Sequence, residues 1–172
     1  MPRVYYSTII SAPIEEVWEY VRDFNGLPKW HPGIKASEIE GGCGPDCNAC
    51  PGIVRRFQLA DGSWMKEQLI SVSDADYSVT YTIIESAMKL KNYVASLSLA
   101  PIVATDETFA EWEAVFDSTD LKAEEETGDI VYEVFCSGLE SLDEVLMEEM
   151  ELLACTECAE QEECEETRCV EE

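Results

Sequence analysis

Histidine and positive charge are both scarce in this sequence. Its 172 residues include one histidine, His31, and 11 Lys or Arg side chains against 37 Asp or Glu. A single histidine excludes multi-histidine metal sites and most His-dependent catalytic triads. A formal charge of −26 repels phosphate backbones and anionic lipid surfaces, so nucleic acids and such membranes are not expected as partners.

Long apolar runs are also missing. No run reaches the ~18 residues that a membrane span needs, and residues 1–6 lack the apolar core of a signal peptide. No glycine-rich phosphate loop or nucleotide fingerprint is present. We therefore predict a soluble, cytoplasmic protein whose length and 46% apolar composition fit a single domain with its own core.

The acidic excess is concentrated near the end of the sequence. Residues 119–172 hold 20 acidic and two basic side chains. We interpret this segment as a helix with a solvated acidic face, followed by an acidic tail. A binding surface for cations or for a basic partner is the alternative.

Hydrophobic periodicity predicts an α+β domain. A helix is expected from Pro13 to about Asn25, a second short one over 27–30, and a long one over 129–153 with an apolar stripe at 3.6 spacing. Short connections between the strands indicate an antiparallel sheet. Seven strands are predicted, at 4–10, 34–40, 52–59, 63–73, 77–84, 91–100 and 108–117.

Alternation along the strands predicts which side chains face the core. Arg55 and Glu67 fall on inward faces that are otherwise apolar and aromatic. An isolated buried charge is costly, so we expect the two to pair. The pattern fits a small-molecule pocket with a few convergent polar groups, and equally a buried ion pair with no chemistry. The other candidate ligand-binding residues are Tyr81, Tyr93, Phe57, Trp112 and Leu97.

Several motifs resemble the START/Bet v 1-like superfamily, and within it the polyketide cyclase/dehydrase-type branch. They are Ser11-Ala12-Pro13-Ile14-Glu15-Glu16-Val17-Trp18, Trp30-His31-Pro32, Pro51-Gly52-Ile53-Val54-Arg55, Lys66-Glu67-Gln68-Leu69, Lys91-Asn92-Tyr93-Val94-Ala95 and Gly138-Leu139. The resemblance covers about residues 3–150. It implies a helix-grip fold, in which a curved antiparallel sheet surrounds the long C-terminal helix, with a hydrophobic cavity between them.

The spacing is also similar to that of the plant lachrymatory factor synthases. That similarity implies that Arg55 and Glu67 are catalytic and that Tyr81 and Tyr93 contact the ligand. The predicted function is then acid–base isomerase, cyclase or lyase chemistry on a small, mostly apolar molecule. A non-catalytic carrier or sensor for an apolar or amphipathic ligand is the alternative. His31 is interpreted as a packing and hydrogen-bonding residue at the edge of the pocket.

Two cysteine clusters depart from the family pattern. Three or four thiolates at such spacing bind zinc or an iron–sulfur cluster in other proteins. Disulfides and free thiols are the alternatives, and either a metal or a redox change would regulate the cavity. Cys136, alone on the long helix, is predicted as a small core residue. The candidate metal ligands are Cys43, Cys47 and Cys50, and then Cys155, Cys158, Cys164 and Cys169.

The same patterns predict the division of the chain. Residues 1–153 form the ligand-binding domain. Residues 154–172 form an acidic, cysteine-rich tail without apolar periodicity.

Overall fold

The structure is a computed structural model. It describes residues 2–40, 48–86, 88, 90–118 and 121–168, with backbone alone at 118, 121–123 and 155–168. In chain order the elements are β1 (Arg3–Ile10), α1 (Ile14–Arg22), the 3₁₀ turn η1 (Leu27–Lys29), β2 (Ile34–Glu40), β3 (Val54–Leu59), β4 (Trp64–Ser73), β5 (Ser78–Glu85), β6 (Leu90–Ile102), β7 (Glu107–Ser118) and α2 (Leu121–Arg168).

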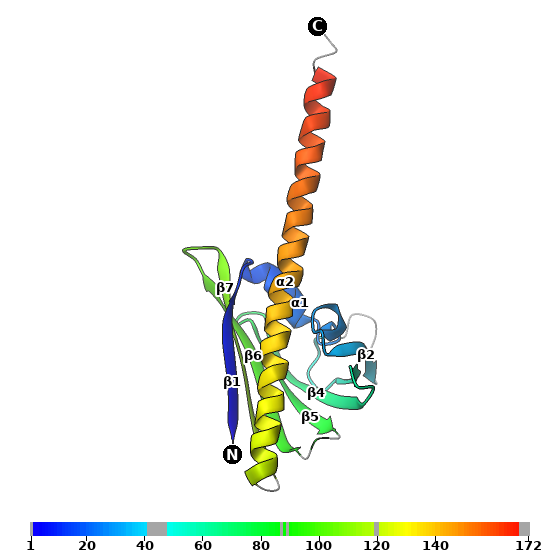
Figure 1. Cartoon of the computed structure of the whole chain (residues 1–172), viewed down its shortest axis with the longest axis vertical. Coiled ribbons are helices and arrows are strands. Elements are labelled where there is room, and N and C mark those ends of the chain that lie inside the picture. Colours follow the sequence, from blue (N-terminus) through cyan, green and yellow to red (C-terminus); the bar gives the residue numbers. More distant parts are fainter. Residues whose placement is uncertain (1, 41–47, 87, 89, 119–120, 169–172) are drawn as a thin grey trace.

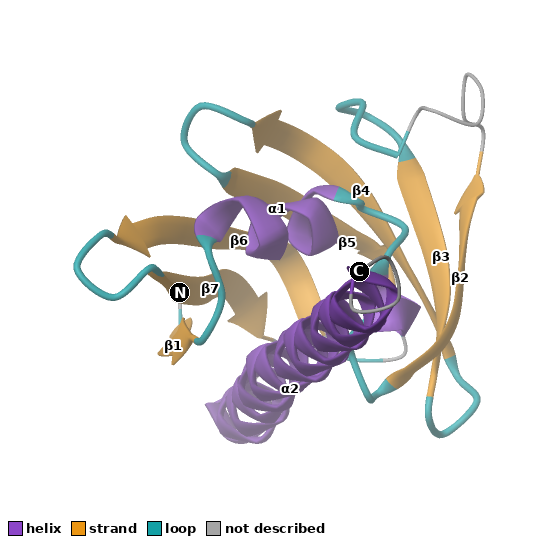
Figure 2. Cartoon of the chain, turned by 90° about the horizontal axis from the view of Figure 1, so that it is seen from above, coloured by secondary structure: helices purple, strands orange, loops and turns teal. Residues whose placement is uncertain are grey.

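The strands form one curved antiparallel sheet in the order β1-β7-β6-β5-β4-β3-β2. Helix α2 runs across the concave face of this sheet, and α1 covers one end of it (Figures 1 and 2). This is the predicted helix-grip architecture. Within the described residues, none of the helices combines the length and the apolar character that a membrane crossing requires.

Alternating side chains account for the two faces of the sheet. The inward faces predicted from the sequence are the buried ones, for example Met65, Glu67 and Leu69 on β4 and Tyr93, Ala95 and Leu97 on β6. Their outward neighbours are half-buried or exposed. The pairing register of the strands brings the two inward-facing charges together, because Arg55 on β3 lies directly opposite Glu67 on β4.

Helix α2 is longer than its apolar stripe predicts. The helix was expected over 129–153, but it has 48 residues and spans Leu121–Arg168. Residues 154–168 of the expected tail therefore continue α2, which extends well beyond the sheet (Figure 1). These flanks are rich in Glu, whose helix propensity acts without any apolar face. Periodicity detects only the part that packs, where Val131, Phe135, Leu139, Leu142 and Leu146 are buried.

At Gly138, α2 packs closely against His31 and Trp112. A Cβ atom there would lie 2.8 Å from Cδ2 of His31 and 3.0 Å from Cζ3 of Trp112. Both distances are too short for a carbon contact, so a larger residue would push α2 away from the sheet. Gly128 lies nearer the start of the same helix. A Cβ atom there would have only Cγ2 of Val4 within 4 Å, at 3.9 Å.

Two glycine substitutions in α2 are therefore expected to act in opposite directions. Gly138→Ala should lower the free energy of unfolding by about 1–3 kcal/mol, because it overpacks the core. Gly128→Ala should raise it by about 0.5–1 kcal/mol, because alanine is the better helix former. Urea unfolding of both variants measures this difference, and equal effects would contradict the tight contact.

Candidate functional site

A cavity lies between the concave face of the sheet, η1 and α2. Its volume is about 120 Å³, and its walls are mostly apolar. A cavity of about 150 Å³ holds one benzene molecule in another protein, so this space suits a ligand of about six heavy atoms. Ile130 and Val134 of α2 line it although their side chains are 48% and 37% exposed, which makes them the rim toward solvent.

The charged groups of this cavity are a buried ion pair. Arg55 and Glu67 are each 5% exposed. Nε of Arg55 donates to Oε2 of Glu67 at 2.8 Å, and Nη2 of Arg55 contacts the same oxygen. Within the described part of the chain no group donates to Oε1 of Glu67. Among the described residues, Arg55 thus holds Oε2 of this carboxylate, and Oε1 receives no hydrogen bond.

Arg55 is also fixed by the turn that follows α1. Its Nη1 donates to the backbone carbonyl of Phe24 at 2.7 Å. The guanidinium carbon lies 4.0 Å from the ring centroid of Phe24 and 5.1 Å from that of Tyr81, so aromatic faces enclose the cation. These contacts compensate part of the cost of burying its charge.

Burial and pairing act in opposite directions on Glu67. Loss of hydration raises the pKa of the Glu67 carboxyl, and the Arg55 guanidinium lowers it; burial is the larger effect, so the pKa is raised. A glutamate with a raised pKa exchanges protons closer to neutral pH than an exposed one does. Removing either partner would leave a buried charge alone, which typically costs about 3–5 kcal/mol.

Two tyrosine hydroxyls lie beside the ion pair. Nε1 of Trp112 donates to the Tyr81 hydroxyl at 3.0 Å. The ring of Tyr93 lies 6.4 Å from the Tyr81 ring between centroids. Burial raises the pKa of both phenols above the usual value, so both keep their protons and serve as hydrogen-bond donors.

His31 connects the cavity wall to α2. Its Nδ1 accepts from the backbone N–H of Gly33 at 3.1 Å, so the ring proton is on Nε2, which donates to the carbonyl of Val134 at 3.1 Å. Burial lowers the pKa of His31 to about 4, with Arg55 also lowering it. The ring therefore stays neutral in the native protein and has a structural part in the cavity.

Most of the residues singled out from the sequence surround this one cavity. Leu97 lies apart, because it lines a separate space of about 20 Å³ behind Arg55. Phe24 was missed, since nothing in a sequence marks a backbone carbonyl as a ligand for arginine. Cys136, expected in the core, is half exposed and donates to Oε1 of Glu140 at 3.2 Å. The predicted residues that line the cavity are Arg55, Glu67, Tyr81, Tyr93, Phe57 and Trp112.

A wider groove of about 750 Å³ lies over α1. Trp18, Arg22 and Tyr77 line it together with several carboxylates. Its ion pair, Arg22 with Asp74, is exposed on both sides. The groove is an open surface depression, and its charges are solvated, so the enclosed cavity is the stronger candidate site.

The metal prediction concerns residues whose side chains are for the most part undescribed. Cys43, Cys47 and Cys169 lie outside the described residues, and so do the side chains of Cys155, Cys158 and Cys164. Cys50 is described and exposed. Among the described residues no group of three or more His, Cys, Asp or Glu is arranged to hold a metal ion. Metal binding by the cysteines therefore stays a prediction.

The curved seven-stranded sheet and the long helix α2 define the helix-grip fold. A family model described as polyketide cyclase/dehydrase and lipid transport matches residues 1–146, and the chain belongs to that family. This confirms the resemblance that the motifs indicated.

Solved structures with the same fold come from bacteria and plants. A protein of Nitrosospira multiformis is 31% identical with a TM-score of 0.66, over 80% of this chain and 93% of that one. XoxI of Bacillus cereus is 23% identical with a TM-score of 0.75, over 86% and 96%. A norcoclaurine synthase mutant of Thalictrum flavum, solved with a transition-state analogue, is 12% identical with a TM-score of 0.68, over 87% and 96%. The last two show the fold alone.

The neutral state of His31 predicts a loss of stability in mild acid. The ordinary pKa of 6.5 applies in the unfolded chain and about 4 in the native one, so the unfolded state takes up the proton first as the pH falls. This stability is fully present above pH 6.5 and is lost as the pH falls toward 4. Between pH 7 and pH 5 the loss should be about 2 kcal/mol.

Urea unfolding at pH 7, 6 and 5 measures that loss. His31→Gln is the control, because glutamine can donate to the Val134 carbonyl but does not titrate. Both proteins share the titration of their carboxylates, so the difference between their curves is due to His31. The stability of His31→Gln should therefore change less over the same range. Parallel curves for the two proteins would contradict a neutral, buried His31.

The metal hypothesis for the cysteines predicts a difference between two masses. Protein purified without oxygen or chelator should have a native mass above its denatured mass by zinc, or by iron with sulfide. A native mass equal to that of the reduced chain would count against the hypothesis. A native mass two hydrogens lower for each cysteine pair would instead indicate disulfides.

Proposed function

We propose that this protein binds a small, mostly apolar molecule in the cavity under α2 and moves a proton on it with Glu67. The observation that carries the proposal is the buried Arg55–Glu67 pair in the wall of an otherwise apolar, enclosed space. Paired charges are costly to bury. A ligand with one polar group can interact with both charges. An apolar wall of the same shape would give that group no partner.

Each polar group has a separate part in the proposed reaction. Oε1 of Glu67, which accepts no hydrogen bond from the described protein, faces no competitor for a proton of the ligand. Arg55 stabilises negative charge that develops on a ligand oxygen. The Tyr81 hydroxyl receives a hydrogen bond from Trp112, so its own proton is left for the ligand oxygen. The reaction class is isomerisation, cyclisation or elimination.

A carrier or sensor is the second candidate function. The observation that favours it is that Arg55 already has Glu67 and the Phe24 carbonyl as partners. A pair that satisfies itself can serve as a structural anchor against which a ligand packs without reacting. The two functions differ in one respect that can be measured, the transfer of a proton between Glu67 and the ligand.

Cyclohexanone in deuterated water distinguishes them. Its six-membered ring fits the volume, its oxygen is an acceptor for Arg55 and Tyr81, and its α-hydrogens are exchangeable. We expect wild-type protein to bind it and to speed deuterium uptake, with a rate that rises with pH through a pKa above the ordinary glutamate value. Glu67→Gln should keep binding and lower the exchange rate about 10²–10⁴-fold.

Matched controls make the result specific to the cavity. Glu85→Gln removes an exposed carboxylate from the neighbouring strand β5 and should change neither binding nor exchange. Methylcyclohexane has the same shape without the oxygen and should bind more weakly. Binding without exchange in the wild-type protein supports the carrier, and exchange that survives in Glu67→Gln contradicts the part given to that residue.

A further inference from the structure

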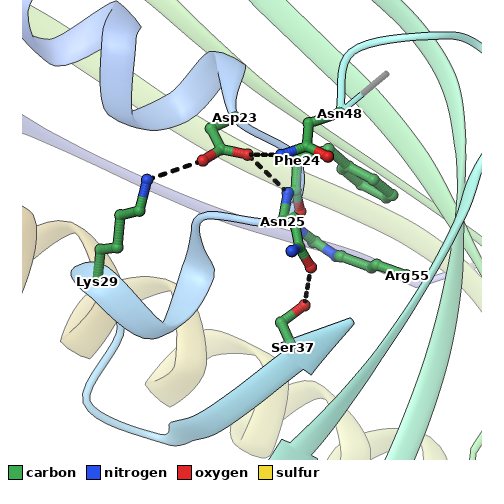
Figure 3. Close-up of polar contacts among 7 residues, drawn as sticks. All are labelled: Asp23, Phe24, Asn25, Lys29, Ser37, Asn48 and Arg55. Carbon is green, nitrogen blue, oxygen red and sulfur yellow. Dashed lines mark hydrogen bonds and ion pairs between the residues drawn. The ribbon is translucent and has the colours of Figure 1, made fainter. Parts of the chain in front are cut away.

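The turn after α1 joins the candidate site to Asn48. Figure 3 shows this turn, Asp23-Phe24-Asn25, between Arg55 on one side and Asn48 on the other. Asn48 lies two residues before Cys50, in the segment that separates β2 from β3. The segment is far from the turn in sequence, so its contacts there are a tertiary feature of the fold.

Arg55 depends on the position of this turn in two ways. It donates to the Phe24 carbonyl at 2.7 Å, and its guanidinium lies against the Phe24 ring at 4.0 Å. A shift of Phe24 therefore changes a hydrogen bond and a cation–π contact together. Since Nε and Nη2 of the same planar group contact Oε2 of Glu67, rotation of the guanidinium also disturbs the ion pair.

Asn48 holds the turn with both its backbone and its side chain. The backbone N–H of Phe24 donates to the Asn48 carbonyl at 3.2 Å. Nδ2 of Asn48 donates to Oδ1 of Asp23 at 2.9 Å, and the same oxygen accepts from the backbone N–H of Asn25 at 3.1 Å. Lys29 takes the other oxygen, Oδ2, at 2.9 Å. Asp23 thus accepts hydrogen bonds from Asn48, Asn25 and Lys29.

We propose that Asn48 is a positioning residue for Arg55, acting through Asp23 and Phe24. The inference rests on the proposed function for its consequence. Arg55 held in this position contacts Oε2 of Glu67 and leaves Oε1 for the ligand. It also assigns a site-related part to Asn48, which lies two residues before Cys50.

The titration of Glu67 reports on this positioning without any ligand. Its carboxyl faces Arg55 from β3, Tyr81 from β5, Tyr93 from β6 and His31 from the segment before β2, all of which line the same cavity. Of these groups only Arg55 lowers the pKa of Glu67. If Arg55 is less well held, that opposing effect weakens and the pKa rises further.

The experiment is an infrared pH titration of the protonated Glu67 carboxyl, identified as the band that is absent in Glu67→Gln. Asn48→Ala should move the midpoint upward, and Asn48→Ser, which keeps a shorter donor, should fall between it and the wild type. Ser37→Ala is the matched control. It removes the 2.8 Å hydrogen bond to Oδ1 of Asn25 in the same turn but does not touch Asp23 or Phe24, so its midpoint should stay at the wild-type value.

Equal midpoints in Asn48→Ala and wild type would overturn the proposal, and so would an equal shift in Ser37→Ala. Circular dichroism establishes that each variant is folded, and Asn48→Ser carries the test should the alanine variant not fold. Because no ligand is used, the result is independent of cyclohexanone exchange. Failure of the proposed function and failure of this inference are therefore separate outcomes.

Discussion

The organisation of this protein follows from the need to bury one charge pair. Arg55 and Glu67 face each other across β3 and β4 inside a sheet whose concave face is otherwise apolar. Burying either charge there without the other is costly. The pair is therefore surrounded by the groups that stabilise it, namely the Phe24 carbonyl and aromatic ring, the Tyr81 ring, and the helix that closes the cavity. The residues that make the interior polar at this spot are also the ones on which the proposed function depends.

Helix α2 determines how well this charge pair is shielded from water. The His31 ring donates to the Val134 carbonyl, and Gly138 lets the helix approach His31 and Trp112 closely. This contact places Val131 and Phe135 over the cavity and leaves Ile130 and Val134 at its rim. Low local hydration follows, which is the cause of the raised pKa of Glu67 and of both buried tyrosines. The packing of the helix and the proton affinity of the site are consequences of the same close contact.

Strand alternation was sufficient to predict the sheet and the inward direction of Arg55, Glu67, Tyr81 and Tyr93, because a strand in a half-buried sheet has a period of two residues. The full extent of α2 was not predictable from periodicity, since its ends are helical by propensity and do not pack. The parts of Phe24 and Asn48 were also hidden, because they rest on backbone carbonyls and on a contact between segments remote in sequence. The division at residue 153 and the cysteine ligands stay predictions.

A crystal structure of the protein soaked with cyclohexanone tests the central claim most directly. We expect the ring in the cavity under α2, with its oxygen within hydrogen-bonding distance of Arg55 or Tyr81 and an α-carbon next to Oε1 of Glu67. A cavity that stays empty while the ketone occupies the open groove over α1, or a ring in the cavity with its oxygen turned away from both donors, would contradict it.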